Sequence, residues 1–201
     1  MSPRVENLPL RCRDWRGLCV PGICSVHATA RPGSTTAGDC SVMPMFQKIT
    51  PYFWFDDNAE EAANFYVSLF DDARITSVSR YGKGAPLPEG TALVVGFELF
   101  GQQFAALNGG PTFKLSEAAS LFVGCDTQAE IDRLWSALSE DGTAQPCGWV
   151  KDRFGLSWQI NWSGVPDVMA RGTAAQQAGM MSAMMQMQKV DLAALERAVK
   201  I

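Results

Sequence analysis

The chain has 201 residues, 47% of them hydrophobic and 19% charged, which is enough for one or two compact units with a core of ordinary size. Gly and Glu interrupt its longest apolar stretches well short of the roughly 20 residues that span a bilayer, so we expect no membrane partner. Residues 45–201 carry twelve Lys and Arg against eighteen acidic residues, and this balance argues against a nucleic-acid partner.

Residues 1–44 differ in composition from the rest of the chain. They contain Cys19, Cys24 and His27, but the second pair of closely spaced ligands that a zinc site needs is missing. The apolar stretch 17–30 contains Pro, Gly and His, which argues against a secretory signal and favours a cytoplasmic protein. We expect a disordered extension, or translation from a start codon upstream of the native one.

A first structural unit begins near residue 48. The aromatic stretch 49–55 predicts a buried strand. Asn58, with Glu61 three residues later, matches a helix capping box, and the apolar spacing behind it predicts a helix that extends to about Phe70. Alternating side chains and Gly-rich turns then predict three further strands. These strands cover 73–81, 91–100 and 103–108.

The same order of elements recurs farther along the chain. A strand at 120–126 precedes a second capping box, formed by Thr127 and Glu130, and a helix at 131–140. Further strands are predicted at 145–153 and 156–162. A shift of 69 residues superimposes the two capping boxes and the apolar helix positions behind them. The sequence therefore contains an internal repeat, with βαβββ units at about 48–110 and 118–162.

The expected fold class is α+β, with two βαβββ repeats forming paired half-barrels around a cleft. We expect this domain to cover 45–165, with each helix on the outer face of its sheet. Residues 166–201 are expected to form a C-terminal helical extension that packs on the barrel edge or on a dimer partner, or that forms a ligand lid. The methionines of this extension are Met169, Met180, Met181, Met184, Met185 and Met187.

Four segments resemble the PhnB-like branch of the vicinal oxygen chelate superfamily, which includes glyoxalases, bleomycin-resistance proteins and extradiol dioxygenases. They lie at 49–56, 59–66, 106–111 and 148–159. The resemblance runs from about residue 48 to the C-terminus and implies a homodimer. The branch carries the name 3-demethylubiquinone-9 3-methyltransferase. The sequence argues against methyl transfer, because the Pro-rich residues after Gly84 cannot open the helix of an S-adenosylmethionine site.

Catalytic members of that superfamily hold one divalent ion with four His, Glu or Gln ligands from the first and last strands of each repeat. The resemblance places these positions at Pro51, Ala105, Ser120 and Gln159. Three of the four residue types cannot serve as usual ligands, so we expect neither a divalent metal nor another cofactor. Glu98 is an alternative carboxylate, but it belongs to the preceding strand and is expected to face solvent.

Strand alternation predicts which side chains line the cleft, and the expected lining is aromatic with a few amide and hydroxyl groups. Such a lining suits a flat or apolar small molecule oriented by one or two hydrogen bonds. The candidate ligand-binding residues are Phe53, Ser120, Phe122, Trp149, Lys151, Gln159 and Asn161. The alternation turns Trp54, Leu121, Val123, Trp158 and Ile160 towards the helices.

No residue is assigned a catalytic role. Cys147 lacks a histidine nearby in the sequence to activate it, and Asp152 is expected to pair with Arg153 at a hairpin turn. The sequence predicts a metal-independent protein or enzyme that binds a small aromatic or apolar molecule. The alternatives are a metal-dependent lyase, isomerase or dioxygenase, a methyltransferase, and a structural dimer with a filled barrel.

Overall fold

The computed structural model describes residues 47–200, so the expectations for residues 1–44 lie outside the described part of the chain. The described residues form two four-stranded sheets with the same strand order, in which the first strand of each sheet neighbours the last. This arrangement confirms the α+β class and the two βαβββ repeats, and the separate sheets are consistent with paired half-barrels.

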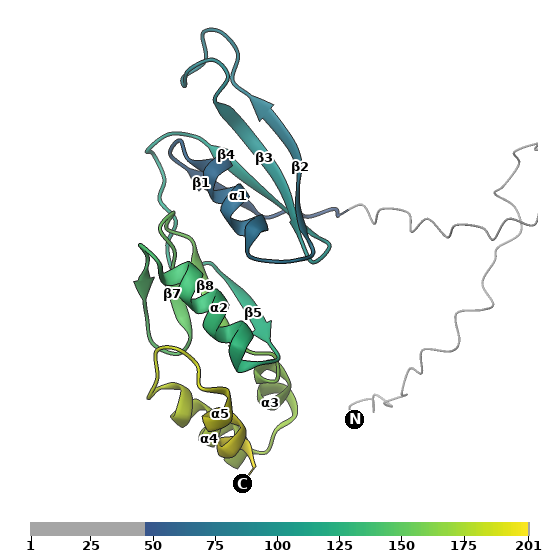
Figure 1. Cartoon of the computed structure of the whole chain (residues 1–201), viewed down its shortest axis with the longest axis vertical. Helices are drawn as coiled ribbons and strands as arrows, with labels where there is room; N and C mark the ends of the chain where they lie inside the picture. Colours follow the sequence, from purple (N-terminus) through teal and green to yellow (C-terminus); the bar gives the residue numbers. More distant parts are fainter. Residues whose placement is uncertain (1–46, 201) are drawn as a thin grey trace, which may run out of the picture. The chain divides into compact units, whose positions relative to one another are not determined.

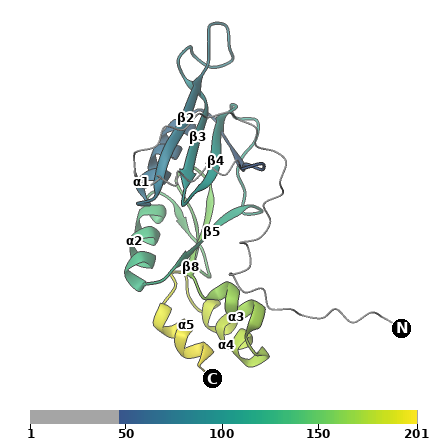
Figure 2. The ribbon, with the colours of Figure 1, turned by 90° about the vertical axis from the view of Figure 1, so that its right-hand side faces the viewer.

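The first repeat follows the predicted order of elements. In its sheet β1 runs parallel to β4, while β3 is antiparallel to both β4 and β2. Helix α1 lies against one face of this sheet (Figures 1 and 2). The elements are β1 (Tyr52–Phe55), α1 (Ala59–Ser68), β2 (Ala73–Arg80), β3 (Ala92–Leu99) and β4 (Gln102–Asn108).

The second repeat has the same layout, with β5 parallel to β8. Its elements are β5 (Ser120–Cys125), α2 (Gln128–Ser139), β6 (Thr143–Ala144), β7 (Trp149–Lys151) and β8 (Ser157–Trp162). The single strand predicted at 145–153 is wrong, because two short strands replace it. Between them Cys147 and Gly148 adopt positive φ values of 62° and 80°, which strand geometry does not allow.

The C-terminal segment forms α3 (Val165–Arg171), α4 (Ala174–Met184) and α5 (Leu192–Val199). Met180 and Met184 are buried, whereas Met169, Met181 and Met185 are exposed. The side chain of Gln128, at the start of α2, bonds the backbone of the loop before α5, so this extension packs on the second repeat. Within residues 47–200, no helix combines the length and hydrophobicity needed to cross a membrane.

Helices α1 and α2 begin differently. Thr127 caps α2 as predicted, because its hydroxyl accepts a hydrogen bond from the Glu130 amide at 3.2 Å. Asn58 makes no such bond, so the first predicted capping box is wrong. The Ala59 amide instead donates to Oδ1 of Asn108, a fully buried side chain of β4, at 2.8 Å. A tertiary contact therefore satisfies one of the orphan amides in the first turn of α1, in the absence of the local cap.

The side-chain alternation predicted for β1 is wrong. Phe53 is 8% exposed and stacks on Phe104, whose ring also stacks on Phe97 in the core. Trp54 was expected to face the helix but lies on the opposite face, where its indole N–H donates to the Gly110 carbonyl at 2.8 Å. The face that carries Phe53 is the one that α1 covers, so core burial sets the direction of this side chain.

Helix α1 also joins the two repeats. The ring of Tyr66 lies 5.2 Å from the ring of Trp158 in β8, and both side chains are fully buried. The Trp158 indole N–H donates to the buried carboxylate of Asp152 at 2.8 Å. The expected pairing of Asp152 with Arg153 is absent among the described residues. The guanidinium of Arg153 lies instead over the ring of Phe65, 4.3 Å from its centroid.

Candidate functional site

The uncovered face of the second sheet carries most of the residues predicted to line the cleft. The strand register aligns Phe122, Gln159 and Trp149 in one row across β5, β8 and β7. It aligns Ser120 and Lys151 with Ser157 in the next row. Because alternate residues of a strand share a face, both rows belong to the same face of the sheet. That these side chains bind a ligand stays a prediction.

Polar atoms on this face are only partly satisfied. The Gln159 side-chain amide donates to the Ser120 hydroxyl at 2.8 Å, while its Oε1 accepts no hydrogen bond from any described residue. The Ser157 hydroxyl is fully buried and has no partner in the described part of the chain. A hydrogen bond from a ligand or a water molecule to such an atom would be favourable.

An apolar pocket of about 240 Å³ opens beside Phe122. Phe122 itself is 42% exposed, which is unusual for an aromatic side chain on a strand. Gln102 is the only polar side chain in the lining. The lining comprises Phe70, Leu99, Phe100, Gln102, Phe104, Leu121, Phe122, Val123, Gly124 and Trp158. The pocket therefore offers aromatic surface and no fixed charge to a bound molecule.

The remaining candidate residues are placed differently. Phe53 is a core residue and does not line this pocket. Asn161 is 1% exposed, and its side-chain amide donates to the Cys147 carbonyl at 3.4 Å, which gives it a structural role. Lys151 forms an ion pair with Glu117, and the hydrogen bond in this pair lowers the pKa of the Glu117 carboxyl. Lys151 is thus already paired and is not a free anion-binding group.

The four positions equivalent to superfamily metal ligands do not fit a divalent ion. Pro51 and Ala105 are neighbours, since the Ala105 amide donates to the Pro51 carbonyl at 3.0 Å, but neither side chain has a ligand atom. In the second repeat, Ser120 and Gln159 bond each other. Among the described residues, no hydrogen bond or strand pairing links the first pair to the second. Within residues 47–200, no three His, Cys, Asp or Glu side chains gather as a metal-binding group.

Comparison with known proteins identifies the family. The 3-demethylubiquinone-9 3-methyltransferase family model matches residues 47–161, more than half of the chain. The chain belongs to this family. The PhnB protein from Bacillus cereus is 40% identical, and the match covers 56% of this chain and 97% of that one with a TM-score of 0.53. Protein PA1353 from Pseudomonas aeruginosa is 23% identical over 56% and 94% of the two chains, with a TM-score of 0.48. No curated protein matches the chain significantly.

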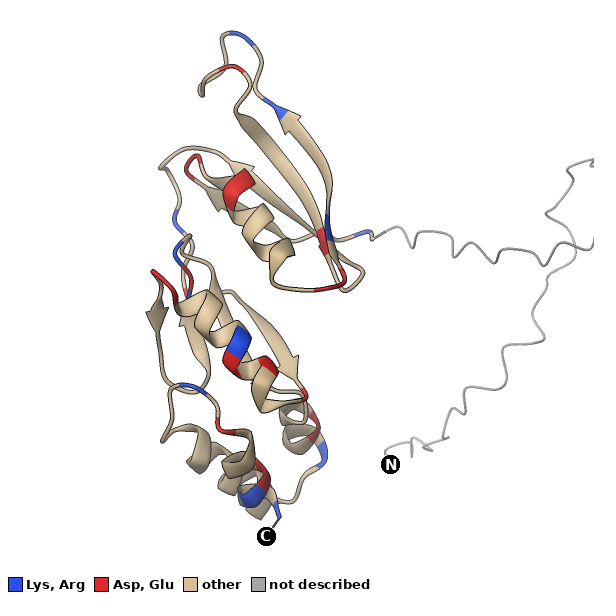
Figure 3. Ribbon diagram, in the orientation of Figure 1, with Lys and Arg blue, Asp and Glu red and all other residues tan. Residues whose placement is uncertain are grey.

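The part of the chain that matches the family holds both repeats, and its charges are mixed. Along the ribbon of residues 47–200, basic residues are interspersed with acidic ones (Figure 3). Several of them are paired, as in Arg80 with Glu60 at 2.8 Å. Glu98 was expected to face solvent, but it is 9% exposed and accepts hydrogen bonds from Arg74 and Gln103. Glu98 therefore forms a structural ion pair with Arg74.

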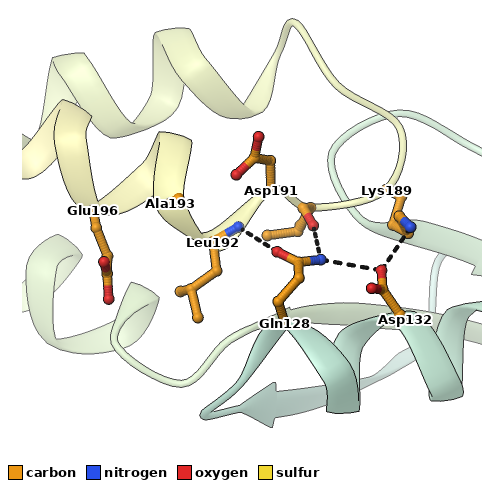
Figure 4. Close-up of a pocket in the computed structure, with 8 residues that line it drawn as sticks. Gln128, Asp132, Lys189, Asp191, Leu192, Ala193 and Glu196 are labelled. Carbon is orange, nitrogen blue, oxygen red and sulfur yellow. Dashed lines mark hydrogen bonds and ion pairs between the residues drawn. The ribbon is translucent and has the colours of Figure 1, made fainter.

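A second, wider groove of about 490 Å³ lies between α2, inside the segment that matches the family, and the C-terminal residues 189–196, outside it (Figure 4). It runs between α2 and α5, and its central side chain, Gln128, donates to Asp132 and to the Val190 carbonyl and accepts from the Leu192 amide. Lys189 pairs with Asp132 at 2.6 Å and lowers the pKa of that carboxyl. These hydrogen bonds and the ion pair hold the C-terminal segment against α2.

The sequence did not reveal several residues that shape the site. Phe70 comes from the loop after α1 and Phe100 from the turn between β3 and β4, yet both reach the pocket beside Phe122. Their contact, 5.4 Å between ring centroids, joins segments thirty residues apart. Phe100 has a positive φ of 48°, which is unusual for a bulky residue. The Phe-Gly turn was visible in the sequence, but nothing in it indicated the direction of the ring.

Proposed function

We propose that this protein binds a small, uncharged aromatic or apolar molecule in the pocket beside Phe122, without a metal ion. The observation that carries the proposal is the aromatic pocket of about 240 Å³, which has Gln102 as its only polar side chain. Its volume lies below the roughly 300–1,000 Å³ typical of drug-sized ligands, so it suits a molecule of one or two rings. Gln159 does not line this pocket, but it is the register partner of Phe122, so its Oε1 atom would orient the part of the ligand that extends past Phe122 onto the uncovered face.

The metal-free part of the proposal rests on donor chemistry. A catalytic divalent ion normally has about three strong protein ligands, and the equivalent positions supply one hydroxyl and one neutral amide that already bond each other. This makes a metal-dependent lyase, isomerase or dioxygenase the less supported alternative. Methyl transfer is also less supported, because the Gly82 to Gly84 segment lies in a loop between two strands and opens no helix.

We further propose that the protein acts as a cytoplasmic homodimer. The cytoplasmic location rests only on the sequence of residues 17–30. Support for the dimer comes from the exposed aromatic side chains Tyr52 and Phe113, which are 63% and 62% exposed. Tyr52 lies on β1, an edge strand of the first sheet, where a second copy could cover it. Light scattering of the purified full chain tests this, and a mass of one chain would contradict it.

Phe122→Ala should weaken binding of 2-naphthol, an uncharged two-ring fluorescent probe, by about tenfold. The substitution removes one aromatic wall of the pocket, and loss of this contact is worth about 1.4 kcal/mol. Phe113→Ala is the matched control, since Phe113 is similarly exposed but contacts Trp54 in the other repeat. Fluorescence titration measures both variants. Equal affinity in the wild type and Phe122→Ala would contradict the proposed site.

Gln159→Ala should weaken binding of the same probe by roughly 0.5 to 1.5 kcal/mol and leave the free energy of unfolding nearly unchanged. A naphthol hydroxyl that extends past Phe122 can donate to Oε1, whereas within residues 47–200 the Gln159 amide makes one hydrogen bond, to Ser120. Titration and urea denaturation of the same variant separate the two effects. A loss of roughly 1 to 3 kcal/mol in stability, with binding unchanged, would show that Gln159 is a structural amide. That result would favour the filled, purely structural dimer.

A further inference from the structure

Two sulfur atoms meet at the surface of the second repeat. Sγ of Cys147, in the turn before β7, lies 3.5 Å from Sδ of Met185, in the loop after α4. Cys147 is half-buried and Met185 is 63% exposed, so solvent reaches the pair. The other described cysteine, Cys125, is fully buried. The pair is separate from the proposed ligand pocket, because neither residue lines it.

Backbone hydrogen bonds hold the two segments together at this point. The Cys147 amide donates to the Met187 carbonyl at 2.9 Å, and the Gly148 amide donates to the Gln188 carbonyl at 2.7 Å. A side chain on Gly148 would place its Cβ 2.6 Å from the carbonyl oxygen of Ile160 in β8, so only glycine fits at this position. The sulfur atoms are therefore brought together by the fixed backbone, and only side-chain rotation is needed to adjust their separation.

We propose that Cys147 and Met185 form a binding site for a soft monovalent cation, with Cu(I) as the ion it would take. Thiolate and thioether sulfurs are the ligands that Cu(I) prefers, whereas Ca²⁺ and Mg²⁺ require oxygen ligands. Within the described residues, no group of three His, Cys, Asp or Glu side chains exists to hold a harder divalent ion here. A thiol beside a thioether thus has the donor chemistry of a soft-metal site.

Binding balances without a change of oxidation state. The Cys147 thiol releases its proton to solvent, the thiolate and the Met185 thioether each donate an electron pair to Cu(I), and water or exogenous ligands leave the ion. Copper and the proton therefore compete for the same sulfur atom.

The experiment uses the full chain labelled with ¹³C at its methionine methyl groups and titrated anaerobically with Cu(I). The Met185 methyl resonance, assigned from its absence in Met185→Leu, should shift as copper is added and stop shifting once the site is full. Met169 is the matched control, being an exposed methionine with no cysteine contact among the described residues. An equal shift of both resonances would overturn the proposal by showing non-specific thioether binding.

Cys147→Ser should abolish the copper-dependent shift of Met185. A Met185 shift that survives this change would overturn the two-sulfur site. Affinity is measured by competition with bicinchoninate in a full chain whose N-terminal thiols are removed, and Met185→Leu in that background should weaken Cu(I) binding at least tenfold. Unchanged affinity would show that the thioether is no ligand. The substitutions that remove the N-terminal thiols are Cys12→Ser, Cys19→Ser, Cys24→Ser and Cys40→Ser.

Discussion

Replacing Trp158 with alanine should lower the free energy of unfolding by about 3 to 5 kcal/mol, the usual cost of deleting a buried tryptophan side chain. Trp158 is fully buried, and its ring lies 5.2 Å from Tyr66 and 6.4 Å from Phe70 of the first repeat. The substitution removes the aromatic contact between the repeats and leaves the Asp152 carboxylate without one of its donors. Urea denaturation measures the loss, which a stable domain of ordinary size could barely tolerate.

Trp158→Phe separates the two contributions. Phenylalanine keeps a ring between the repeats but loses the indole N–H, so a smaller loss of about 1 to 3 kcal/mol is expected. The alanine variant should also enlarge the pocket beside Phe122, because Trp158 contributes to its wall. If Trp158→Ala costs less than about 2 kcal/mol, the contact between α1 and β8 is not an important link between the repeats.

Local signals were enough to predict the repeat architecture. The second capping box, the apolar helix positions and the strands of alternating side chains all depend on residues close in sequence. The contacts of Asn108, in contrast, could not be predicted from local sequence signals. It was predicted only as the end of a strand, yet its buried side chain caps α1 and also donates to the Ala92 carbonyl at 2.9 Å. Such a contact joins segments 49 residues apart and leaves no local pattern.

The face of β1 was mispredicted for a related reason. The 69-residue shift that superimposes the helix caps also pairs Phe53 with Phe122, but Phe53 is buried towards α1 and Phe122 is exposed. The strand residues that pack against the core in the second repeat are Leu121 and Val123. Each lies one residue before the position that the shift pairs with Phe53 or Phe55. The spacing between the first strand and its helix therefore differs by one residue between the two repeats. Because side chains alternate along a strand, this difference reverses which strand residues face the core. The faces of β5 and β8 were predicted correctly, because the alternation within these two strands matches their burial.

Contacts of the C-terminal segment could not be predicted either. Its methionines indicated only an apolar surface of adaptable shape. Which methionine meets Cys147 depends on the turn before β7, where the predicted strand is interrupted, and on the loop that follows α4. The capping of α4 by Thr173 and Gln176 is a local signal, but it fixes only the start of that helix.

Asp152→Ala should lower the free energy of unfolding by about 3 kcal/mol, because each buried donor left unsatisfied costs roughly 1 to 3 kcal/mol. The carboxylate is 4% exposed. Its Oδ1 accepts from the amides of Phe154 and Leu156 at 2.9 and 3.0 Å, and its Oδ2 accepts from Trp158. Asp152→Asn should cost less, since an amide oxygen can keep the two backbone bonds. Its NH₂ group would then face the indole N–H, so some loss remains.

The pH dependence of these variants gives a second, independent readout. Burial raises the pKa of Asp152 above its ordinary value, although the interactions with Trp158, Tyr66 and the backbone amides oppose this. The folded protein therefore binds a proton more readily than the unfolded chain. The stability that this proton contributes is fully present below the unfolded pKa and is lost as pH rises through the folded pKa. Asp152→Asn cannot titrate, so the stability difference between wild type and this variant should widen as pH falls from neutral towards 3.8.

Tyr66→Phe is the control that keeps all three bonds of Asp152. The Tyr66 hydroxyl is buried without a partner among the described residues, and burial followed by the charge of Asp152 raises the pKa of its phenol. Removing it should leave stability nearly unchanged, because the hydroxyl has no close hydrogen-bond partner and its weak interaction with the Asp152 carboxylate is offset by the cost of burying a hydroxyl. Urea denaturation at neutral pH and near pH 4 compares the wild type with both variants. A stability difference between wild type and Asp152→Asn that narrows on acidification would show that the hydrogen bonds outweigh burial. The carboxylate would then be held in its charged form.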